Sequence, residues 1–299
     1  MAIIPFDDRD GQIWWAGKLV PWRAARPHVL THGLHYGSGV FEGERAYGGN
    51  IFKLREHTDR LIASGRILGF EIPYTADEID AACKLVLEAN GLIDGYIRPL
   101  AYRGSEMLAV SAQLTKIHLA IAAWPWPNLF GADRMKGVRL GWAKWKRPHP
   151  ETAPTASKAA GLYMIGTLSK HAAETEGFDD ALMLDWRGQV AEATGANIFF
   201  VIDGELHTPI PDCFLDGITR RTVMKLARKR QIKVVERVIM PDELSRASEA
   251  FLAGTAAEVT PVRQIGDLRF DLGPVSKLLL ADYEALVLMS PEEVQRLAA

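Results

Sequence analysis

The segment TASKAAGLY, residues 155–163, sets one lysine, Lys158, among small and mostly uncharged residues. A lysine amine is nucleophilic only after it loses its proton, so burial or a nearby cation must lower its reference pKa of about 10.4. Small neighbours would let a bulky group approach this amine: Ala156, Ala159, Ala160 and Gly161. Taken alone, however, a lysine is more often a solvated surface residue. The rest of the sequence must therefore decide between these interpretations.

Two other patterns suggest different chemistry. His32 and His35 lie three residues apart in THGLHYG, a spacing that a metal site could use, but no third ligand follows at a suitable spacing. We therefore predict no metal. Cys83 and Cys213 are far apart and form no C-x-x-C motif, so we interpret both as packing residues rather than as a disulfide or a thiolate site.

A basic cluster could indicate a nucleic-acid-binding helix, but the charge of the whole chain argues against that function. The cluster comprises Arg220, Arg221, Lys225, Arg228, Lys229, Arg230 and Lys233. The 299 residues carry 35 Lys plus Arg against 37 Asp plus Glu, a formal charge of -2, which offers no general attraction to nucleic acid or to an anionic membrane. We interpret the cluster as a solvated helix face. The acidic start of the chain does not resemble a signal peptide, and we expect a cytoplasmic protein.

The first part of the sequence alternates strand-like and helical patterns. QIWWAGKLV predicts a hairpin that turns at Ala16 and Gly17, and apolar spacing predicts helices in REHTDRLIASGRILGF and in ADEIDAACKLVLEANG, the second ending at Gly91. The patterns of YIRPLAYRG and KIHLAIAAW predict strands. Residues 125–137 are rich in Pro, Gly and Asn and lack a period, so we place the boundary between two domains there.

The second part begins with a predicted strand, VRLGWAKWKR, and with the lysine segment. A helix from about Leu162 to Thr175 precedes two hairpins, which turn at Arg187-Gly188 and at Asp203-Gly204, the second a type I′ candidate. The remaining predicted elements are, in order, helix GITRRTVMKLARKRQ, strand KVVERVI, helical turn PDELSRA, strand EAFLAGT and a helix over 275–288.

Several stretches that follow one another along the chain carry a family resemblance. They are HVLTHGLHYGSGVFEGERAY, REHTDRL, YIRP, SKAAGLY, EATGANIF, GITR and GTAAEVTPV. In this order they resemble the pyridoxal phosphate enzymes of fold type IV, and among them the branched-chain amino acid aminotransferases. The resemblance implies a two-domain α/β (α+β) fold like that of D-amino acid aminotransferase. A small domain at 1–124, a loop at 125–137 and a larger domain at 138–299 would hold the cofactor between them.

The resemblance also assigns roles toward pyridoxal 5'-phosphate. Lys158 would bind the cofactor aldehyde covalently and later move a proton at the substrate α carbon. Glu192, beside Asn197, would pair with the pyridine nitrogen, because a nearby carboxylate favours its charged form. Tyr163 would bond the ring oxygen. The phosphate would lie at a helix start, where backbone N–H groups lack partners, and its ligands would be Arg60, Gly217, Ile218, Thr219 and Thr255. Asp216 stands where the family has proline and is interpreted as a helix cap.

The expected substrate pocket combines aromatic walls with an arginine, so that it accepts both an apolar side chain and a carboxylate. By resemblance Arg98 and Tyr96 bind the distal carboxylate of glutamate, and the backbone N–H of Ala256 binds the α-carboxylate. The other expected pocket residues are Tyr36, Phe41, Arg45, Tyr163 and Trp126. Several of these residues could instead be packing residues.

The resemblance implies transamination of L-leucine, isoleucine or valine with 2-oxoglutarate in a homodimer. FEGERAY and YIRP favour this activity over the D-amino acid and (R)-amine transaminases of the same fold, which stay open as alternatives because GSEMLAVSAQ departs from the family pattern. A 4-amino-4-deoxychorismate lyase fits less well, since a lyase that releases pyruvate needs no site for the glutamate side chain.

Overall fold

The computed structural model describes residues 4–126, 136–290 and 293–294. Most of the expected interdomain loop, residues 127–135, lies outside the described residues. The chain forms two compact units: unit 1 comprises Met1–Trp126 and Ser157–Gly161, and unit 2 comprises Pro127–Ala156 and Leu162–Ala299. The lysine segment Ser157–Gly161 therefore belongs to unit 1, whereas the sequence assigned it to the second domain. None of the described helices has the length and apolarity needed to span a membrane.

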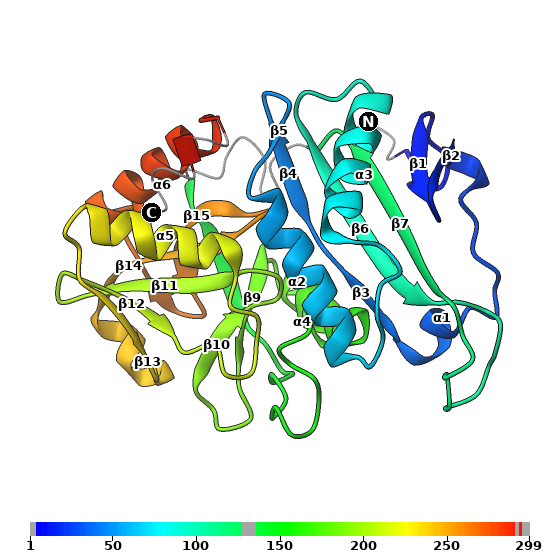
Figure 1. The fold of residues 1–299 in the computed structure, drawn as a ribbon. Helices are drawn as coiled ribbons and strands as arrows, with labels where there is room; N and C mark the ends of the chain where they lie inside the picture. The colour runs from blue at the N-terminus through cyan, green and yellow to red at the C-terminus, as the bar shows by residue number, and fades with distance from the viewer. Residues whose placement is uncertain (1–3, 127–135, 291–292, 295–299) are drawn as a thin grey trace. The chain divides into compact units, whose positions relative to one another are not determined.

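Unit 1 is built on a seven-stranded sheet with strand order β2-β1-β7-β6-β4-β5, in which β3 also pairs with β6 (Figure 1). Its strands are β1 (Gln12–Trp15), β2 (Lys18–Pro21), β3 (Gly39–Phe41), β4 (Glu44–Tyr47), β5 (Asn50–Ile51), β6 (Gly95–Arg103) and β7 (Ile117–Trp124). Its helices are α1 (His32–Tyr36), α2 (Leu54–Ile67) and α3 (Ala76–Ala89), and α2 and α3 pack on the sheet. The central strand β6 pairs antiparallel with β3, β4 and β7.

The two faces of this sheet differ because side chains alternate along each strand. Ile97 and Ala101 of β6, with Leu119 and Ile121 of β7, belong to the apolar core that α2 and α3 cover. Tyr96 and Arg98 have the opposite parity and so point to the other face. This face is not part of the helix-covered core, and its residues are free to serve a site.

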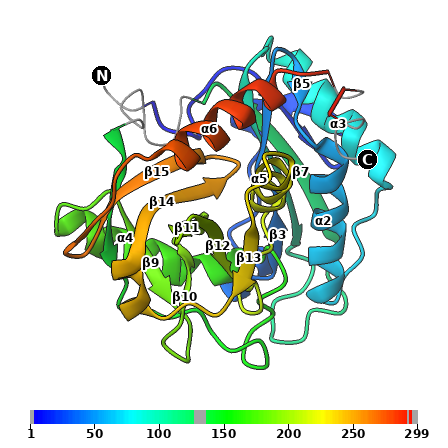
Figure 2. The same cartoon turned by 90° about the vertical axis from the view of Figure 1, so that its left-hand side faces the viewer.

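Unit 2 contains a nine-stranded sheet with strand order β10-β9-β8-β15-β14-β11-β12-β13, and β16 pairs with β15. Its strands are β8 (Val138–Trp142), β9 (Asp180–Leu184), β10 (Val190–Ala193), β11 (Asn197–Ile202), β12 (Glu205–Pro209), β13 (Val234–Arg237), β14 (Ala247–Gly254), β15 (Glu258–Ile265) and β16 (Leu268–Arg269). Its helices are α4 (Met164–Thr175), α5 (Ile218–Lys229) and α6 (Pro274–Val287), and α5 and α6 lie side by side (Figure 2).

Most of the predicted helices, strands and turns are present in the structure. The turn at Asp203-Gly204 has φ of 53° and 80°, which confirms the predicted positive values at both central positions. The chain turns after α3 at Gly91, with φ of 62°, as predicted. One strand prediction was too long, because β8 ends at Trp142 instead of continuing to Arg147. The strand β15 was not predicted; it begins at Glu258, inside GTAAEVTPV, and continues to Ile265.

Candidate active site

Lys158 is held in unit 1 by main-chain contacts. Its backbone N–H donates to the Ser64 hydroxyl on α2 at 3.0 Å, and its carbonyl accepts from the Phe41 N–H at 3.2 Å. The hydroxyl of Ser157 donates to the Ser64 carbonyl at 3.0 Å. These bonds explain why the segment belongs to unit 1, and they fix the backbone from which the lysine side chain extends. The amine nitrogen lies 5.0 Å from the centroid of the Phe41 ring.

The small residues beside Lys158 have a packing reason within unit 1. A Cβ atom placed on Gly37 would lie 3.1 Å from the Cα of Gly161, so the two backbones approach each other closely. Gly37 also has φ of 63°, a conformation that favours glycine. Ala159 forms a β-bridge with Val40 and is buried. The small side chains at these positions therefore let the two backbones contact each other. They would also let a ligand approach.

Arg60 belongs to a buried ionic cluster on α2. Its Nε and Nη2 donate to the two oxygens of Glu42 at 2.6 and 2.9 Å, and the His57 ring pairs with the same carboxylate at 2.7 Å. Glu42 has no exposed surface. Burial would raise the pKa of this carboxyl, but Arg60 and His57 together hold it well below its usual value. Burial lowers the pKa of His57, and the nearby Arg60 and Lys158 charges lower it further. Glu42 thereby orients the Arg60 guanidinium.

The site face of the unit 1 sheet, defined here by Phe41, Tyr96, Arg98, Trp124 and Trp126, brings together predicted substrate residues. The guanidinium carbon of Arg98 lies 4.8 Å from the Phe41 ring centroid and 5.2 Å from that of Tyr96. Its Nη2 donates to the Tyr96 hydroxyl at 3.2 Å. Trp126 packs against Tyr96 with ring centroids 5.3 Å apart. A cation is therefore held among aromatic rings.

Arg45 and Tyr36 are two further predicted pocket residues of unit 1. Arg45 pairs with Tyr96 across β4 and β6, so it shares the site face, and its guanidinium carbon lies 5.1 Å from the Tyr47 ring centroid. Tyr36 is 48% exposed on α1 and stacks on His32 at 4.5 Å. The ring nitrogens of His32 pair with the Ser38 hydroxyl and the Ala109 carbonyl, and the Nε2 of His35 pairs with the Val29 carbonyl. These contacts account for both histidines as structural residues.

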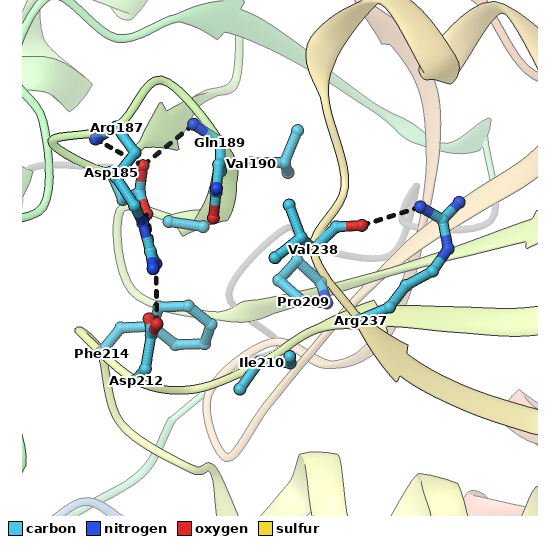
Figure 3. A pocket seen from close by; sticks show the side chains of 11 residues that line it. Asp185, Arg187, Gln189, Val190, Pro209, Ile210, Asp212, Phe214, Arg237 and Val238 are labelled. Carbon is cyan, nitrogen blue, oxygen red and sulfur yellow. Dashed lines mark hydrogen bonds and ion pairs between the residues drawn. The ribbon is translucent and has the colours of Figure 1, made fainter.

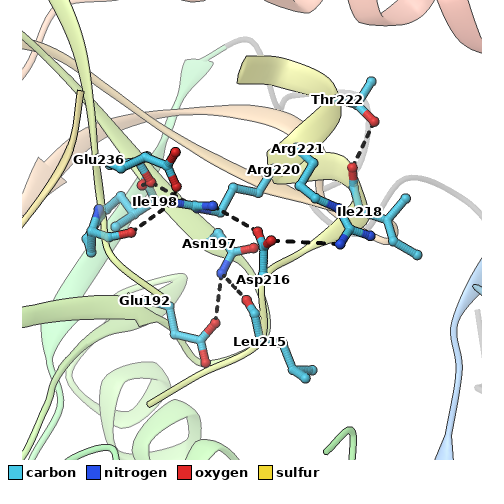
Figure 4. A network of polar contacts seen from close by, with 12 residues as sticks. Glu192, Asn197, Ile198, Leu215, Asp216, Ile218, Arg220, Arg221, Thr222 and Glu236 are labelled. Carbon is cyan, nitrogen blue, oxygen red and sulfur yellow. Dashed lines mark hydrogen bonds and ion pairs between the residues drawn. The ribbon is translucent and has the colours of Figure 1, made fainter. Parts of the chain in front are cut away.

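In unit 2, Glu192 and Asn197 are paired as predicted for neighbouring ends of two strands (Figure 4). The amide of Asn197 donates to Glu192 Oε2 at 3.1 Å and to the Leu215 carbonyl at 3.0 Å. The second Glu192 oxygen lies 3.5 Å from Nε of Arg147, which is 7% exposed. A buried carboxylate held by an amide and a guanidinium is preorganised to pair with a cationic ring nitrogen.

The start of α5 leaves backbone N–H groups without partners in the helix, as an anion site requires. Gly217 is its N-cap and provides no side-chain cap, and the first helical bond joins the Arg221 N–H to the Gly217 carbonyl. The N–H groups of residues 218–220 precede that bond. A Cβ on Gly217 would lie 2.2 Å from Oδ1 of Asn197, so glycine lets the helix start approach the Glu192–Asn197 pair. Ile218 and Thr219 are both buried.

Two sequence interpretations at this helix were wrong. Asp216 does not cap α5, because it precedes the N-cap and its carboxylate turns to Nη1 of Arg220 at 2.8 Å. Arg220 is not on a solvated face: it is 1% exposed, and its Nη2 donates to the Pro209 carbonyl and to Glu236 (Figure 4). The cation thus ties the start of α5 to β12 and β13. The exposed members of the basic cluster are Lys225, Arg228, Lys229, Arg230 and Lys233.

The other predicted cofactor and α-carboxylate residues of unit 2 lie in a turn or at the end of a 3-10 helix. Thr255 and Ala256 form the turn between β14 and β15, and both are partly buried. Tyr163 is the residue before α4, and its carbonyl accepts from the Thr167 hydroxyl at 3.2 Å. These positions leave the backbone N–H of Ala256 and the side chain of Thr255 in a tight hairpin turn, where main-chain donors are well placed for an anion.

A separate pocket in unit 2 is lined by Asp185, Arg187, Asp212, Phe214 and residues around them (Figure 3). Within the described residues, Asp185, Asp212 and Cys213 form a group with the donor atoms of a metal site. Arg187, however, pairs with both carboxylates at 2.7 Å and already supplies the positive charge. Burial raises the pKa of the Cys213 thiol to about 12, so the sulfur stays protonated. Two carboxylates that an arginine already neutralises, beside a protonated thiol, do not suit a metal ion.

Each unit carries part of the residue set that the resemblance predicts. Unit 1 supplies an amine that suits an aldehyde, an arginine held by a carboxylate, and an aromatic face. Unit 2 supplies a buried carboxylate, which suits a basic ring nitrogen, and a helix start, which suits a phosphate. The sequence model of the family described as Amino-transferase class IV matches residues 39–265. The chain belongs to the class IV aminotransferases.

Relatives and solved structures agree with this family. The branched-chain-amino-acid aminotransferase of Pseudomonas aeruginosa is 44% identical over 288 residues, or 94% of each chain. The branched-chain aminotransferase of Thermoproteus uzoniensis, solved with norvaline, has a TM-score of 0.92 at 37% identity, covering 96% of this chain and 98% of that one. A branched-chain amino acid aminotransferase from T.th., complexed with N-(5'-phosphopyridoxyl)-L-glutamate, has a TM-score of 0.91 at 38% identity, covering 96% and 97%.

These comparisons confirm the predicted fold type IV architecture and the enzyme class. Class IV aminotransferases use pyridoxal phosphate, which confirms the predicted cofactor. The contacts of this aminotransferase also identify residues that the sequence did not single out: Glu42, Ser64, Trp124 and Arg147. Trp124 could have been found from strand parity, because it precedes Trp126 by two residues. Arg147 had no such signal, since it lies in an irregular segment that reaches Glu192 only in the folded unit.

Proposed function

We propose that this aminotransferase transfers the amino group of L-leucine, isoleucine or valine to 2-oxoglutarate, giving branched-chain 2-oxo acids and L-glutamate. The observation that carries the proposal is the site face of unit 1, where aromatic rings surround Arg98. The rings suit an apolar side chain and the guanidinium suits a carboxylate, so one pocket serves both substrates. The names of the relatives and the norvaline complex support the same substrate class.

Lys158 is the proposed catalytic residue. Pyridoxal phosphate, when bound, supplies an electron sink for the electron pair left at the substrate α carbon when its proton is removed. The Lys158 amine would hold the cofactor through its aldehyde in the resting enzyme, and during turnover it would take and return the proton of the substrate α carbon. The bonds from Ser64 and Phe41 to the Lys158 backbone keep the amine in position for both tasks.

The remaining cofactor residues hold the two ends of the ring system. Glu192 pairs with the pyridine nitrogen and stabilises its positive charge, and Asn197 and Arg147 fix that carboxylate. Gly217, Ile218 and Thr219 bind the phosphate at the start of α5, with Thr255 and Arg60 as further donors. Tyr163 donates to the ring oxygen. Each assignment follows the resemblance of the sequence to the family.

The substrate residues divide by chemistry. Phe41, Tyr36 and Trp126 provide apolar walls. Arg98 and Tyr96 receive the distal carboxylate of glutamate or 2-oxoglutarate, Arg45 lies at the edge of the pocket, and the Ala256 N–H receives the α-carboxylate. We further propose that the enzyme works as a homodimer in the cytoplasm, which sedimentation of the holoenzyme would test.

The function is tested by incubating the holoenzyme with each donor and 2-oxoglutarate and measuring glutamate and the branched-chain 2-oxo acid. We expect stoichiometric formation of both from L-leucine, L-isoleucine and L-valine. D-alanine and an (R)-amine serve as matched controls and should give at least about tenfold lower rates, corresponding to ~1.4 kcal/mol of discrimination. Turnover of these controls without glutamate formation from any branched-chain donor would move the enzyme to the D-amino acid or amine transaminases.

A further inference from the structure

The site face of unit 1 holds buried nitrogen donors that lack acceptors. Within the described part of the chain, Arg98 Nε, Trp124 Nε1 and Trp126 Nε1 are buried atoms with no hydrogen-bond partner. Buried N–H groups normally have a partner, and an indole N–H that is buried usually finds one. Three such donors on neighbouring side chains point to an acceptor that arrives with a ligand.

Strand register explains why these donors gather on one face. Tyr96 pairs directly with Trp124 across β6 and β7, so the two side chains lie on the same face. Arg98 follows Tyr96 by two positions in β6 and therefore has the same parity. Trp126 lies just beyond β7, and its ring packs against that of Tyr96 with centroids 5.3 Å apart. The ring centroids of Tyr96 and Trp124 are 5.2 Å apart, and the Arg98 guanidinium carbon lies 6.0 Å from the Trp124 ring centroid.

Packing holds the Trp124 ring in place. Trp124 is 7% exposed, and the ring of Phe6 contacts it edge-on at 5.3 Å. Trp126 contacts it from another direction at 6.0 Å. Apolar packing alone would be served equally well by phenylalanine, which buries a similar ring without leaving a donor unsatisfied.

The charge of this face defines the missing acceptor. No carboxylate among the described residues forms an ion pair with Arg98, so the face presents a cation and neutral donors. An anionic acceptor with more than one oxygen, a carboxylate, satisfies the guanidinium and an indole N–H together. Among the substrates of the proposed reaction, only the dicarboxylates bring a second carboxylate.

We propose that Trp124 is a specificity-determining residue that donates its indole N–H to the distal carboxylate of the dicarboxylate substrate. This inference rests on the proposed function and adds a donor to the pair Arg98 and Tyr96. It separates the two substrate classes: the dicarboxylate gains the bond, whereas a branched apolar side chain leaves the indole N–H unpaired.

The test compares Trp124→Phe with the wild-type holoenzyme in equilibrium binding of two unreactive acids, glutarate and 4-methylpentanoate, by calorimetry. We expect the Kd of glutarate to rise about tenfold, as for the loss of one hydrogen bond to a charged group. The Kd of 4-methylpentanoate should change less than about twofold, because this acid has no distal carboxylate. In turnover, the KM for 2-oxoglutarate should rise while kcat with leucine holds.

Trp14→Phe is the matched control, since Trp14 is a buried tryptophan of β1 in the helix-covered core of the same sheet. It should leave both Kd values unchanged. If Trp124→Phe does not fold, Trp124→Leu replaces it, because leucine is apolar and brings no hydrogen-bond donor.

The outcomes are distinct. An unchanged glutarate Kd in a folded Trp124 variant overturns the inference while wild-type glutamate formation upholds the proposed function. Equal weakening of both acids also overturns it, because it would place Trp124 at the α-carboxylate or in general packing. Absence of glutamate formation by the wild type would instead overturn the proposed function itself.

Discussion

Unit 1 and unit 2 handle polar groups in different ways. On the site face of unit 1, side-chain donors of Arg98 and Trp124 are buried without acceptors. In unit 2, Glu192, Asn197 and Arg220 are bonded to protein partners, and backbone N–H groups at the start of α5 have no partner within the helix. Backbone N–H groups are present whatever the residue type, so they suit a cofactor that is always bound. Side-chain donors change when the residue is substituted, so they suit the part of the site that selects substrates.

The same contrast appears within unit 1, between two glutamates that are neighbours in sequence. Glu42 is paired with Arg60 and His57, which holds its pKa well below the usual value. Glu44 is equally buried, but burial and the charge of Glu42 raise its pKa well above the usual value. A buried carboxyl is therefore ionised only where the fold supplies cations. Five predictions test these comparisons.

Lys158→Ala should have the largest effect. Removing the amine should lower kcat by at least about 10³-fold, because one group acts as both nucleophile and proton carrier. The visible absorption band of lysine-bound cofactor and reductive trapping by borohydride should disappear while the circular dichroism spectrum is kept. Lys170→Ala, on the surface of α4, is the control. Full turnover by Lys158→Ala would remove this residue from the mechanism.

Glu42→Gln should destabilise unit 1 by about 3 kcal/mol, because it leaves Arg60 and His57 beside a neutral amide. Urea unfolding of the apoenzyme would measure this loss, and cofactor titration should show weaker binding if Glu42 orients Arg60 toward the phosphate. Glu71→Gln breaks an exposed pair with Arg66 and should cost no more than about 0.5 kcal/mol. Equal stability of the two variants would contradict the orienting role.

Glu192→Gln keeps the shape of the side chain and the contact with Asn197 but removes the negative charge. We expect kcat to fall about 10²-fold, or ~2.7 kcal/mol, because the pyridine nitrogen loses its counter-charge. The absorption maximum of the bound cofactor should shift with it. A rate loss without a spectral change would indicate a structural role for Glu192 instead.

Gly217→Ala should disturb the backbone cradle of unit 2, since its Cβ would lie 2.2 Å from Oδ1 of Asn197. We expect a loss of about 2 kcal/mol in stability, together with weaker binding of cofactor. Gly195→Ala is the matched control, because its Cβ would meet no atom within 4 Å. Cofactor binding as tight as in the wild type would show that the helix start does not need this close approach.

Glu44→Gln should have the smallest effect, visible as a pH dependence. Because the pKa of Glu44 is raised in the folded state, its contribution to stability is complete below the unfolded value of 4.5 and is lost as pH rises toward the folded pKa. The wild type should lose up to about 1.4 kcal/mol per pH unit in that window from this group. Glu44→Gln should remove this decline, which urea unfolding at several pH values would measure. Glu42, with its lowered pKa, should not contribute to the decline there.

Local sequence patterns were sufficient to predict much of the fold. The helices α2 and α3, the hairpin at Asp203-Gly204 and strands β6 and β7 follow from apolar period and turn residues, which act over a few residues. The strand β15 was missed because its sequence was interpreted only as a turn motif, and β8 was predicted too long because Lys144 and Lys146 kept an alternating pattern beyond Trp142.

The sequence by itself determined the family and the cofactor, and it predicted Lys158 as the nucleophile, because ordered motifs and residue types specify chemistry. Tertiary structure decided which groups neutralise one another. Only folding brings Glu42 to Arg60, Arg147 to Glu192 and Glu236 to Arg220, and it made Asp216 an ion-pair partner instead of a cap. It also placed Trp124 beside Arg98 through strand register. Charge pairing depends on distances between residues far apart in the chain, and no local pattern encodes those distances.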